Sequence, residues 1–204
     1  MTGVQVRRAG QSDAAELAQV AAVTFPLACP PHTTDEAKRA FIAAHLSEAR
    51  FAEYLDDPRR LLLVAEDEHG ALGYTMLVLG EPSDADVAAA ITLRPTVELS
   101  KCYTLPRAHG SGAASELMAA SLTAAAEWGE PSDAEEGATE RPVGVWLGVN
   151  QENARAQRFY GKHGFERVGL KRFLVGDRYE DDFVYERPLA PAARRAAAAD
   201  LTAS

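Results

Sequence analysis

The pattern of apolar and polar positions predicts a short strand followed by helices in the N-terminal part of the chain. The strand covers residues 4–9, and apolar residues then recur at helical spacing from residue 17 to residue 23. We expect Ser12 to cap this first helix and Pro26 to end it. A second helix is expected to start at Thr33-Thr34-Asp35, and a third around residues 51–55.

After this helical part the pattern changes to apolar runs separated by turn-forming residues. Residues 61–66 and 72–79 flank a turn that contains Gly70, which predicts an antiparallel hairpin. The polar residues 82–95 then form a connector to the next strand. The further strands are expected over residues 97–105, 143–149, 165–174 and 178–185, and a turn at Gly176-Asp177 joins the last two. Helices are expected over residues 111–128 and 153–163, and Gly164 closes the second of them.

This order of elements predicts a single α/β domain with a mixed, mostly antiparallel sheet and helices on both faces. We expect the domain to span residues 1–189. Residues 129–142 are acidic and rich in turn formers, so we expect a surface loop there. Residues 190–204 are rich in alanine and arginine, have no evident packing partner, and are expected to form a frayed tail.

Composition narrows the class of protein. The chain has 204 residues, of which 47% are hydrophobic and 25% charged, as in an ordinary soluble globular domain. No apolar run approaches the roughly 20 residues that a membrane span needs, and residues 1–8 contain no apolar segment of signal-peptide length. We therefore expect a cytoplasmic protein without a membrane partner. The high alanine and arginine content is typical of a GC-rich bacterial genome.

Charge and cysteine content exclude further classes. A net charge of −9 leaves no basic stripe for nucleic acid, and an acidic surface favours cationic small molecules instead. Cys29 and Cys102 lie far apart with no histidine at ligand spacing, so neither a disulfide nor a metal site is expected. Cys102 falls within a predicted strand, where a buried hydrophobic role is favoured over that of a nucleophile.

A glycine-containing turn between a predicted strand and a predicted helix is a candidate phosphate site. Gly110 and Gly112 allow backbone N–H groups to approach a pyrophosphate, and the helix that starts near Ser111 adds its positive dipole end. Arg107 adds a cation that can chelate phosphate oxygens. The alternative is an ordinary tight strand-to-helix connection. A dinucleotide-binding fold is disfavoured, because the third glycine and the later acidic residue are missing.

Two motifs together resemble the GNAT superfamily of acetyl-CoA-dependent N-acetyltransferases. The first is Arg107-x-x-Gly110-x-Gly112 after a strand, and the second is Asn153-x-x-Ala156-x-x-Phe159-Tyr160 on a helix. The resemblance covers nearly the whole chain and is most specific from Glu98 onward. Within the superfamily the chain is most similar to the bacterial spermidine/spermine (polyamine) N-acetyltransferase branch. This finer resemblance rests on residues 99–106, 145–149 and 176–189.

The resemblance implies a binding site for acetyl-CoA, with no metal. The backbone of residues 102–104 would hydrogen bond the pantetheine arm, and N–H groups of residues 109–113 would hold the pyrophosphate. Asn150 and Asn153 would bind the pantetheine or cap the helix, and Lys162 would meet a CoA phosphate. The implied cofactor-binding residues are Cys102, Tyr103, Thr104, Arg107, His109, Gly110, Ser111, Gly112, Ala113, Asn150, Asn153 and Lys162.

Acetyl transfer to an amine needs a base for the amine and an acid for the departing thiolate. By the resemblance, Tyr160 is the acid; the alternative is an aromatic pair with Phe159 buried in the core. Glu98 precedes Thr104 by six residues, a spacing at which several family members keep a glutamate base; the alternative is a solvated strand residue. Alternation along the strand predicts one shared face for Glu98, Ser100, Cys102 and Thr104.

The resemblance favours a polyamine as the acceptor, and many family members are homodimers. The alternatives are a protein α-amino group, an amine antibiotic, or a non-catalytic CoA-binding regulatory module, against which the intact Tyr160 argues. Glu48, Glu53 and Tyr54 either line an acceptor pocket or are ordinary surface positions. The remaining acidic candidates, for which a solvated hairpin turn is favoured over attraction of a polycation, are Asp177, Glu180, Asp181 and Asp182.

Overall fold

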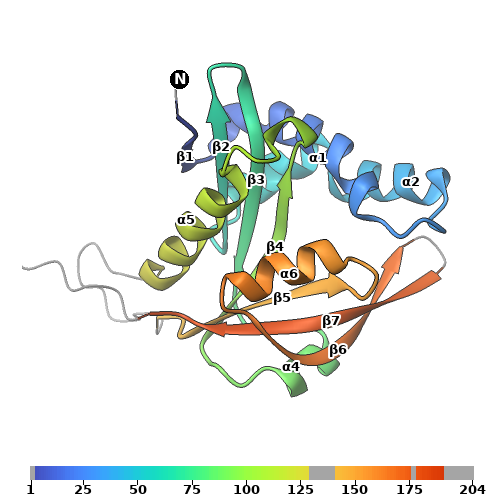
Figure 1. The fold of residues 1–204 in the computed structure, drawn as a ribbon, viewed down its shortest axis with the longest axis vertical. Helices are drawn as coiled ribbons and strands as arrows, with labels where there is room; N and C mark the ends of the chain where they lie inside the picture. The colour runs from blue at the N-terminus through green and yellow to red at the C-terminus, as the bar shows by residue number, and fades with distance from the viewer. Residues whose placement is uncertain (1–2, 129–140, 176–177, 191–204) are drawn as a thin grey trace, which may run out of the picture.

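Seven strands form one sheet in the order β1-β2-β3-β4-β5-β7-β6 in the computed structural model, which describes residues 3–128, 141–175 and 178–190 (Figure 1). All neighbouring strands are antiparallel except β4 and β5, which are parallel. The strands are β1 (Gln5–Arg8), β2 (Arg60–Asp67), β3 (Gly70–Leu79), β4 (Thr96–Thr104), β5 (Gly144–Asn150), β6 (Glu166–Val175) and β7 (Arg178–Pro188). The predicted mixed, mostly antiparallel sheet is confirmed.

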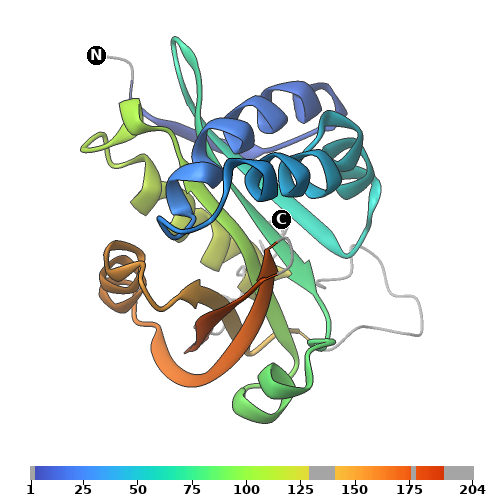
Figure 2. The ribbon, with the colours of Figure 1, turned by 90° about the vertical axis from the view of Figure 1, so that its right-hand side faces the viewer.

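Helices cover both faces of this sheet, as predicted. The helices are α1 (Ala14–Ala28), α2 (Asp35–His45), α3 (Glu48–Asp56), α4 (Ala85–Ala90), α5 (Ala113–Glu127) and α6 (Ala154–Lys162), with short 3₁₀ turns η1 (Gln11–Asp13) and η2 (Pro106–Ala108). On one face, α1 and α3 pack over a core that includes Leu17, Phe51 and Tyr74. On the opposite face, α5 buries Leu117 and Met118 against the sheet (Figure 2).

The start and end of α1 differ from the prediction. Ser12 lies in η1 and does not cap the helix; instead the Asp13 carboxylate accepts the N–H of Gly10 at 2.7 Å and is held by Arg7 at 2.8 Å. This charge-assisted pair between exposed Arg7 and buried Asp13 fixes the turn more strongly than a serine hydroxyl does. Pro26 lies inside α1, where it removes only one N–H donor near the helix end.

The predicted connector over residues 82–95 contains a helix that the sequence analysis did not assign. Asp84 caps α4, because its carboxylate accepts the N–H groups of Asp86 and Val87 at 2.9 and 3.2 Å. The buried Glu186 carboxylate on β7 then accepts the N–H groups of Thr92 and Leu93. The carboxylates of Asp84 and Glu186 therefore hold the two ends of this segment, which leads directly into β4.

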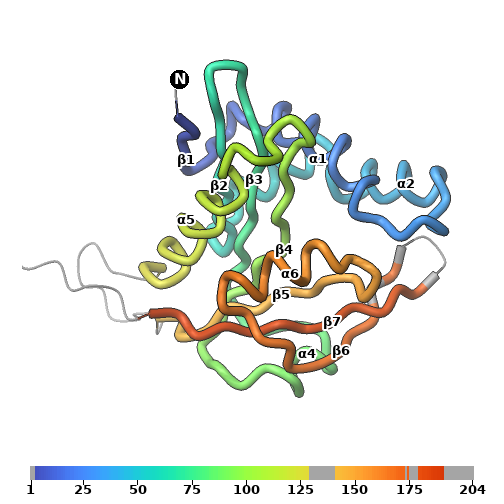
Figure 3. The backbone as a smooth tube through the Cα atoms, in the orientation of Figure 1, coloured from blue at the N-terminus to red at the C-terminus, as the bar shows by residue number. Residues whose placement is uncertain are grey.

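Strands β4 and β5 diverge after a short stretch of pairing. Their register joins only Thr96 to Gly144, Val97 to Val145, and Glu98 to Trp146. Beyond Glu98, β4 continues to pair with β3 on its other side. The chain then passes from β4 through η2 into α5 (Figure 3). The backbone of residues 99–104 therefore presents an edge toward β5 that the β5 ladder does not satisfy.

A β-bulge in β4 changes which side chains share a face. Lys101 pairs with Met76 and Leu99 with Leu77, so Ser100 is an extra residue without a partner on β3. The extra residue reverses the alternation after it. Glu98 shares a face with Lys101, whereas Cys102 lies on the opposite face with Leu99. The predicted shared face of Glu98, Ser100, Cys102 and Thr104 is therefore wrong.

Some predicted segments lie largely or wholly outside the described residues. These are the acidic loop at residues 129–142, the tail at residues 190–204 and the turn at Gly176-Asp177. Within the described ranges, no helix combines the length and the apolar character that crossing a membrane requires.

Candidate functional site

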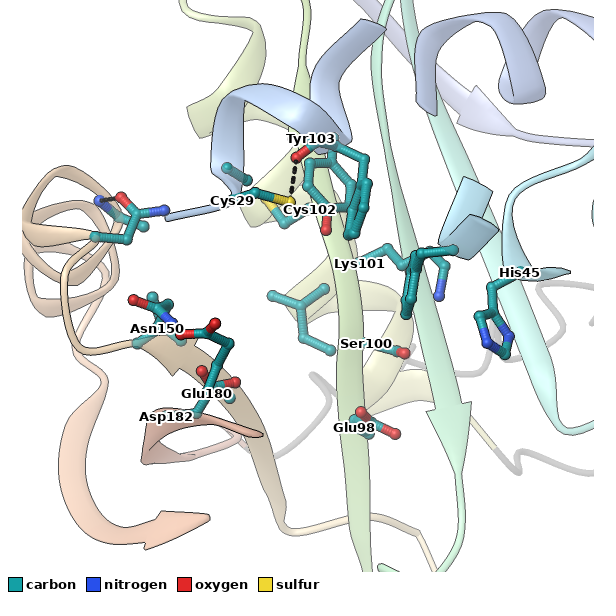
Figure 4. Close-up of a pocket in the computed structure, with 18 of the residues that line it drawn as sticks. Cys29, His45, Glu98, Ser100, Lys101, Cys102, Tyr103, Asn150, Glu180 and Asp182 are labelled. Atoms are coloured by element: carbon teal, nitrogen blue, oxygen red, sulfur yellow. Dashed lines mark hydrogen bonds between the residues drawn. The ribbon is translucent and has the colours of Figure 1, made fainter. Parts of the chain in front are cut away.

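A cavity of about 600 Å³ lies where β4 and β5 diverge (Figure 4). Its walls come from the C-terminal end of α1, from α2 and α3, from β4 and β5, from the start of α6, and from β6 and β7. Phe25, Phe41, Leu46 and Tyr54 supply apolar and aromatic surface. The cavity is thus built from segments far apart in the chain, and its polar groups come mainly from β4 and β7.

Strand β4 crosses the cavity and presents different chemistry to its two sides. Glu98, Lys101 and Tyr103 face the side covered by α1 to α3. Cys102 faces α6, and burial raises the pKa of its thiol to about 12. The thiol therefore stays protonated near neutral pH, in agreement with the role of a small hydrophobic residue rather than a nucleophile.

Tyr160 on α6 brings a phenol to the cavity wall. Its ring packs edge-on against Phe159 and Phe165, with centroids 5.6 and 5.8 Å apart, and its hydroxyl hydrogen bonds to the Cys102 thiol. Burial and the neighbouring Cys102 raise the pKa of Tyr160 well above its usual value. Phe159 and Tyr160 pack against the core, as the alternative predicted, and Tyr160 also lines the cavity with a protonated phenol.

Two asparagines shape the entry to α6. The Asn153 side chain accepts the N–H of Ala156 at 3.0 Å, so it caps the helix. The Asn150 side chain accepts the N–H of Glu152 at 2.9 Å and closes the turn that leaves β5. Both residues line the cavity. Of the two roles predicted for Asn153, capping is the one observed.

The turn before α5 presents several backbone donors at one place. Gly110 and Gly112 have φ angles of +84° and +89°, which side chains with a Cβ rarely adopt. Within the described residues, the N–H groups of Gly110, Gly112 and Ala114 donate to no protein atom. The N–H groups of the other turn residues are used internally: that of His109 by Pro106, that of Ser111 by Ala108, and that of Ala113 by the Ser111 hydroxyl.

Arg107 holds this turn in place. Its guanidinium donates to the Asp67 carboxylate at 3.0 Å, to the carbonyl of Gly70 at 3.1 Å and to that of Ala71 at 2.8 Å. These bonds engage both terminal nitrogens with the turn between β2 and β3. The structure therefore shows a brace, where the sequence analysis expected a chelator of phosphate.

Of the predicted coenzyme residues, Cys102, Tyr103, Asn150 and Asn153 line the cavity, whereas Thr104, Arg107, residues 109–113 and Lys162 do not. His109 is exposed in the turn between η2 and α5. Lys162 is exposed at the end of α6 and borders a separate hollow together with Thr123 and Arg187. Neither side chain lines the cavity at the divergence of β4 and β5.

Two acidic residues of β7 are buried, which corrects the prediction of a solvated hairpin. Glu180 and Asp182 are each only 7% exposed and line the cavity, whereas Asp181 is exposed. Burial raises the pKa of Asp182 to about 6, against a smaller lowering by Lys171. Glu180 lies 2.7 Å from His32, which joins β7 to the segment between α1 and α2. Asp177 lies outside the described residues.

The other residues predicted to lie near the acceptor differ in whether they line the cavity. Tyr54 lines the cavity, but Glu48 and Glu53 do not, and Glu53 instead pairs with Arg50 along the surface of α3. The sequence analysis missed several polar cavity residues because only the folded strands bring them together. These are His45, Lys101 and Lys171. In β7, the period-two spacing of Glu180, Asp182, Val184 and Glu186 is a signal that could have indicated an inward face.

No group of histidine, cysteine, aspartate and glutamate in the described ranges is arranged to hold a metal ion. Both cysteines are free thiols. The polar groups of the cavity wall include the phenols of Tyr54, Tyr103 and Tyr160, three carboxylates and two lysines.

Comparison with known proteins gives consistent findings. A family model described as "Acetyltransferase (GNAT) domain" matches residues 58–167. Uncharacterized N-acetyltransferases of Mycobacterium bovis and Mycobacterium tuberculosis are 48% identical over 178 residues, covering 87% of this chain and 99% of the relatives. Among solved structures, the PaiA N-acetyltransferase of Thermoplasma acidophilum in complex with coenzyme A has a TM-score of 0.67 at 17% identity, with 91% and 99% coverage of this chain and that chain.

A second solved structure shows the same fold. The ribosomal-protein-S18-alanine N-acetyltransferase of Escherichia coli has a TM-score of 0.62 at 15% identity, with 95% of this chain and 98% of that chain covered. At these identities the structural matches establish the shared fold.

Proposed function

Because the chain belongs to the GNAT family of N-acetyltransferases, we propose that it transfers the acetyl group of acetyl-CoA to a primary amine of a small molecule, with Tyr160 as the general acid. The observation that carries this proposal is the position of the Tyr160 hydroxyl. Tyr160 lines the cavity where β4 and β5 diverge, and its hydroxyl hydrogen bonds to the Cys102 thiol of β4. A protonated phenol at this point suits the release of a thiol.

The chain offers groups that fit acetyl-CoA, which when bound supplies an acetyl group activated as a thioester. The β4 edge over residues 102–104 presents backbone groups that β5 leaves unpaired, as an extended amide-containing arm requires. The N–H groups of Gly110, Gly112 and Ala114, which have no acceptor within the described residues, support a pyrophosphate site at the start of α5. These observations support the coenzyme site expected from the motif.

In this proposal Tyr160 acts on the departing sulfur. The amine nitrogen forms a bond to the carbonyl carbon while the carbon–sulfur bond breaks, and the sulfur takes the phenolic proton. The raised pKa of Tyr160 keeps that proton in place until the thiolate develops. The resulting tyrosinate is then reprotonated from solvent.

Glu98 is the proposed acceptor of the amine proton. The bulge at Ser100 places Glu98 on the face of β4 that looks toward α1 to α3, opposite the face of Cys102 and Tyr160. Acid and base thus approach the reacting carbon from different sides, as attack on a thioester requires. Both residues line the same cavity.

The other expected coenzyme residues take supporting roles. Arg107 positions the pyrophosphate turn through its bonds to the β2–β3 turn, and Asn153 positions Tyr160 by capping α6. Asn150 borders the cavity and is proposed to contact the pantetheine arm. Lys162 lies too far along α6 to line the cavity, so its proposed contact with a CoA phosphate is restricted to the nucleotide end.

Two kinds of amine acceptor remain candidates. A polyamine is supported by the carboxylates of Glu98, Glu180 and Asp182 in the cavity wall. An amine that also bears an anionic group is supported by Lys101 and Lys171, which line the same cavity. A protein α-amino group needs the cavity to admit a peptide end, and an amine antibiotic needs it to admit a bulky ring system.

The test is release of free CoA from acetyl-CoA, with the acetylated product identified by mass spectrometry. The panel contains spermidine, free amino acids, an aminoglycoside and a peptide with a free N-terminus. Transfer to at least one amine is expected. Tight binding of acetyl-CoA without any acetylated product across the panel contradicts the catalytic proposal and favours a CoA-binding regulatory module.

A further inference from the structure

Lys101 brings an ammonium group to the cavity wall. It lies on β4 directly after the bulge, and its side chain is only partly exposed. Within the described residues it makes no hydrogen bond and no ion pair. Its one defined contact is with the face of the Tyr54 ring, whose centroid lies 5.4 Å from the ammonium nitrogen. A buried ammonium without a partner carbonyl or carboxylate is costly, so it points to a ligand.

The groups around Lys101 carry both signs of charge. Arg60 lies over the same Tyr54 ring at 4.8 Å, and its own charge is compensated by Asp57 at 3.0 Å. His45 borders the same part of the cavity, and both Lys101 and burial lower the pKa of its imidazole. The acidic group facing Lys101 is Glu98, which raises the pKa of Lys101 but not enough to offset burial, which lowers it to about 8.

The opposite wall of the cavity has the opposite character. Glu180 and Asp182 of β7 lie across from Lys101 and His45 (Figure 4). Lys171 lies beside Asp182 in the register of β6 and β7 and contacts the Trp146 ring at 5.5 Å. The cavity wall therefore carries the Lys101 ammonium on β4 and, across from it, the carboxylates of Glu180 and Asp182 on β7. A polycation filling this space would meet Lys101 with like charge.

We propose that Lys101 binds the carboxylate of the acetyl acceptor, so that the acceptor is a free amino acid or a close analogue rather than a polyamine. This inference rests on the proposed acetyl transfer and names its substrate class. Because Lys101 and Tyr160 line the same cavity, a carboxylate held at Lys101 keeps an α-amino group in the cavity that contains the acid. The carboxylate supplies the anion that Lys101 lacks.

The apolar part of the cavity defines where the acceptor's side chain lies. Phe25 and Phe41 stack with ring centroids 4.4 Å apart and border the cavity together with Leu46. This surface suits an apolar or aromatic side chain, while Glu180 and Asp182 suit a cationic one. The test therefore includes both kinds of amino acid.

The experiment compares acceptors that differ only in the carboxylate. L-phenylalanine is paired with L-phenylalaninamide and with phenylethylamine, and L-lysine with L-lysinamide and cadaverine; spermidine is included as the polyamine. The wild-type protein is expected to acetylate the free acid of at least one pair with a kcat/KM at least tenfold above its amide. Amidation makes the amine less basic and so leaves more of it neutral, which means that the amide's reactivity does not explain a preference for the acid.

Two variants assign this preference to a residue. In Lys101→Met the kcat/KM for the free acid is expected to fall about 10- to 100-fold, through KM, while that for the amide and the decarboxylated amine changes less than threefold. Lys101→Arg is expected to restore part of the preference. Lys38→Met, which removes a lysine of α2 that pairs with Asp35 and does not line the cavity, is expected to leave the acid-to-amide ratio unchanged.

Three outcomes overturn the inference. They are equal activity on acids and amides in the wild-type protein, an equal loss on both in Lys101→Met, and spermidine as the best acceptor. If no amine is acetylated at all, the proposed function fails, and the inference is decided separately by calorimetry with CoA present. The inference is supported if the free acid binds to the wild-type protein, while its amide does not and Lys101→Met does not bind the acid. It is contradicted if this pattern of binding is absent.

Discussion

At the scale of single residues, the proposed chemistry depends on the Tyr160 hydroxyl. Tyr160→Phe keeps the ring packing against Phe159 and Phe165 but removes the proton donor. Without that donor we expect kcat to fall about 100-fold or more, while KM for acetyl-CoA stays within about threefold. Steady-state kinetics over a range of acetyl-CoA concentrations provide the measurement.

The matched control for this substitution is Tyr179→Phe. Tyr179 is 60% exposed on β7 and lies outside the cavity, so the same atom is removed without effect on kcat. An unchanged kcat in Tyr160→Phe would show that another group protonates the sulfur, and thermal denaturation of both variants would exclude loss of folding as the cause.

Asp182 makes stability depend on pH in an unusual direction. Burial raises its pKa to about 6, so the folded protein holds this proton more tightly than the unfolded chain does. This contribution favours folding at low pH and is lost as the pH rises through 6. Asp182→Asn is therefore expected to increase the free energy of unfolding at pH 7.5 by about 1–3 kcal/mol and to have little effect at pH 4.

Urea denaturation of wild type and variant at the two pH values checks this prediction. The control is Asp181→Asn, which removes the same charge from an exposed neighbour on β7 and is expected to change stability by less than about 0.5 kcal/mol at either pH. A loss of stability in Asp182→Asn at pH 7.5 would instead show that the ionised carboxylate stabilises the folded protein through Lys171.

At the scale of elements, two glycines in open surroundings are expected to respond oppositely to alanine. A Cβ at Gly112 or at Gly161 meets no atom within 4 Å, so packing does not distinguish them. Gly112 has a φ of +89° ahead of α5, where alanine costs about 1–2 kcal/mol. Gly161 lies within α6, where alanine gains about 1 kcal/mol.

Chemical denaturation of the two variants measures this difference. For Gly112→Ala we also expect a several-fold higher KM for acetyl-CoA, because the backbone change reorients an N–H group proposed to hold the pyrophosphate. Equal stability of the two variants would contradict the backbone argument. An unchanged KM in Gly112→Ala would remove this N–H group from the coenzyme site.

At the scale of the whole molecule, the divergence of β4 from β5 joins the two halves of the domain around one cavity. The proposed coenzyme site lies along this divergence and continues to the start of α5. Adding CoA at about 100 times its Kd is expected to stabilise the protein by about 2.7 kcal/mol. Local protection should therefore be strongest where the proposed site lies.

Amide hydrogen exchange with and without CoA tests this placement. We expect slowed exchange for the N–H groups of Gly110, Gly112 and Ala114 and for residues 102–104, and little change in α4 on the far side of the sheet. Protection confined to the hollow beside Lys162 would place the coenzyme elsewhere and contradict the assignment.

The sequence by itself determined the element order, the fold class and the two motifs. Local periodicity and turn chemistry specify these, because each depends on residues a few positions apart. Thr34 capping α2 and Gly164 following α6 with a positive φ are examples. The helix α4 was missed because a six-residue segment carries too few apolar positions to show a period.

Only the tertiary structure decided which side chains meet. The bulge at Ser100 moved Lys101 onto the face of Glu98, and the pairing of β7 with β5 and β6 buried Glu180 and Asp182. Arg107 became a brace because the β2–β3 turn lies beside it. Strand register, divergence and burial depend on contacts between distant segments, so local sequence patterns do not determine them.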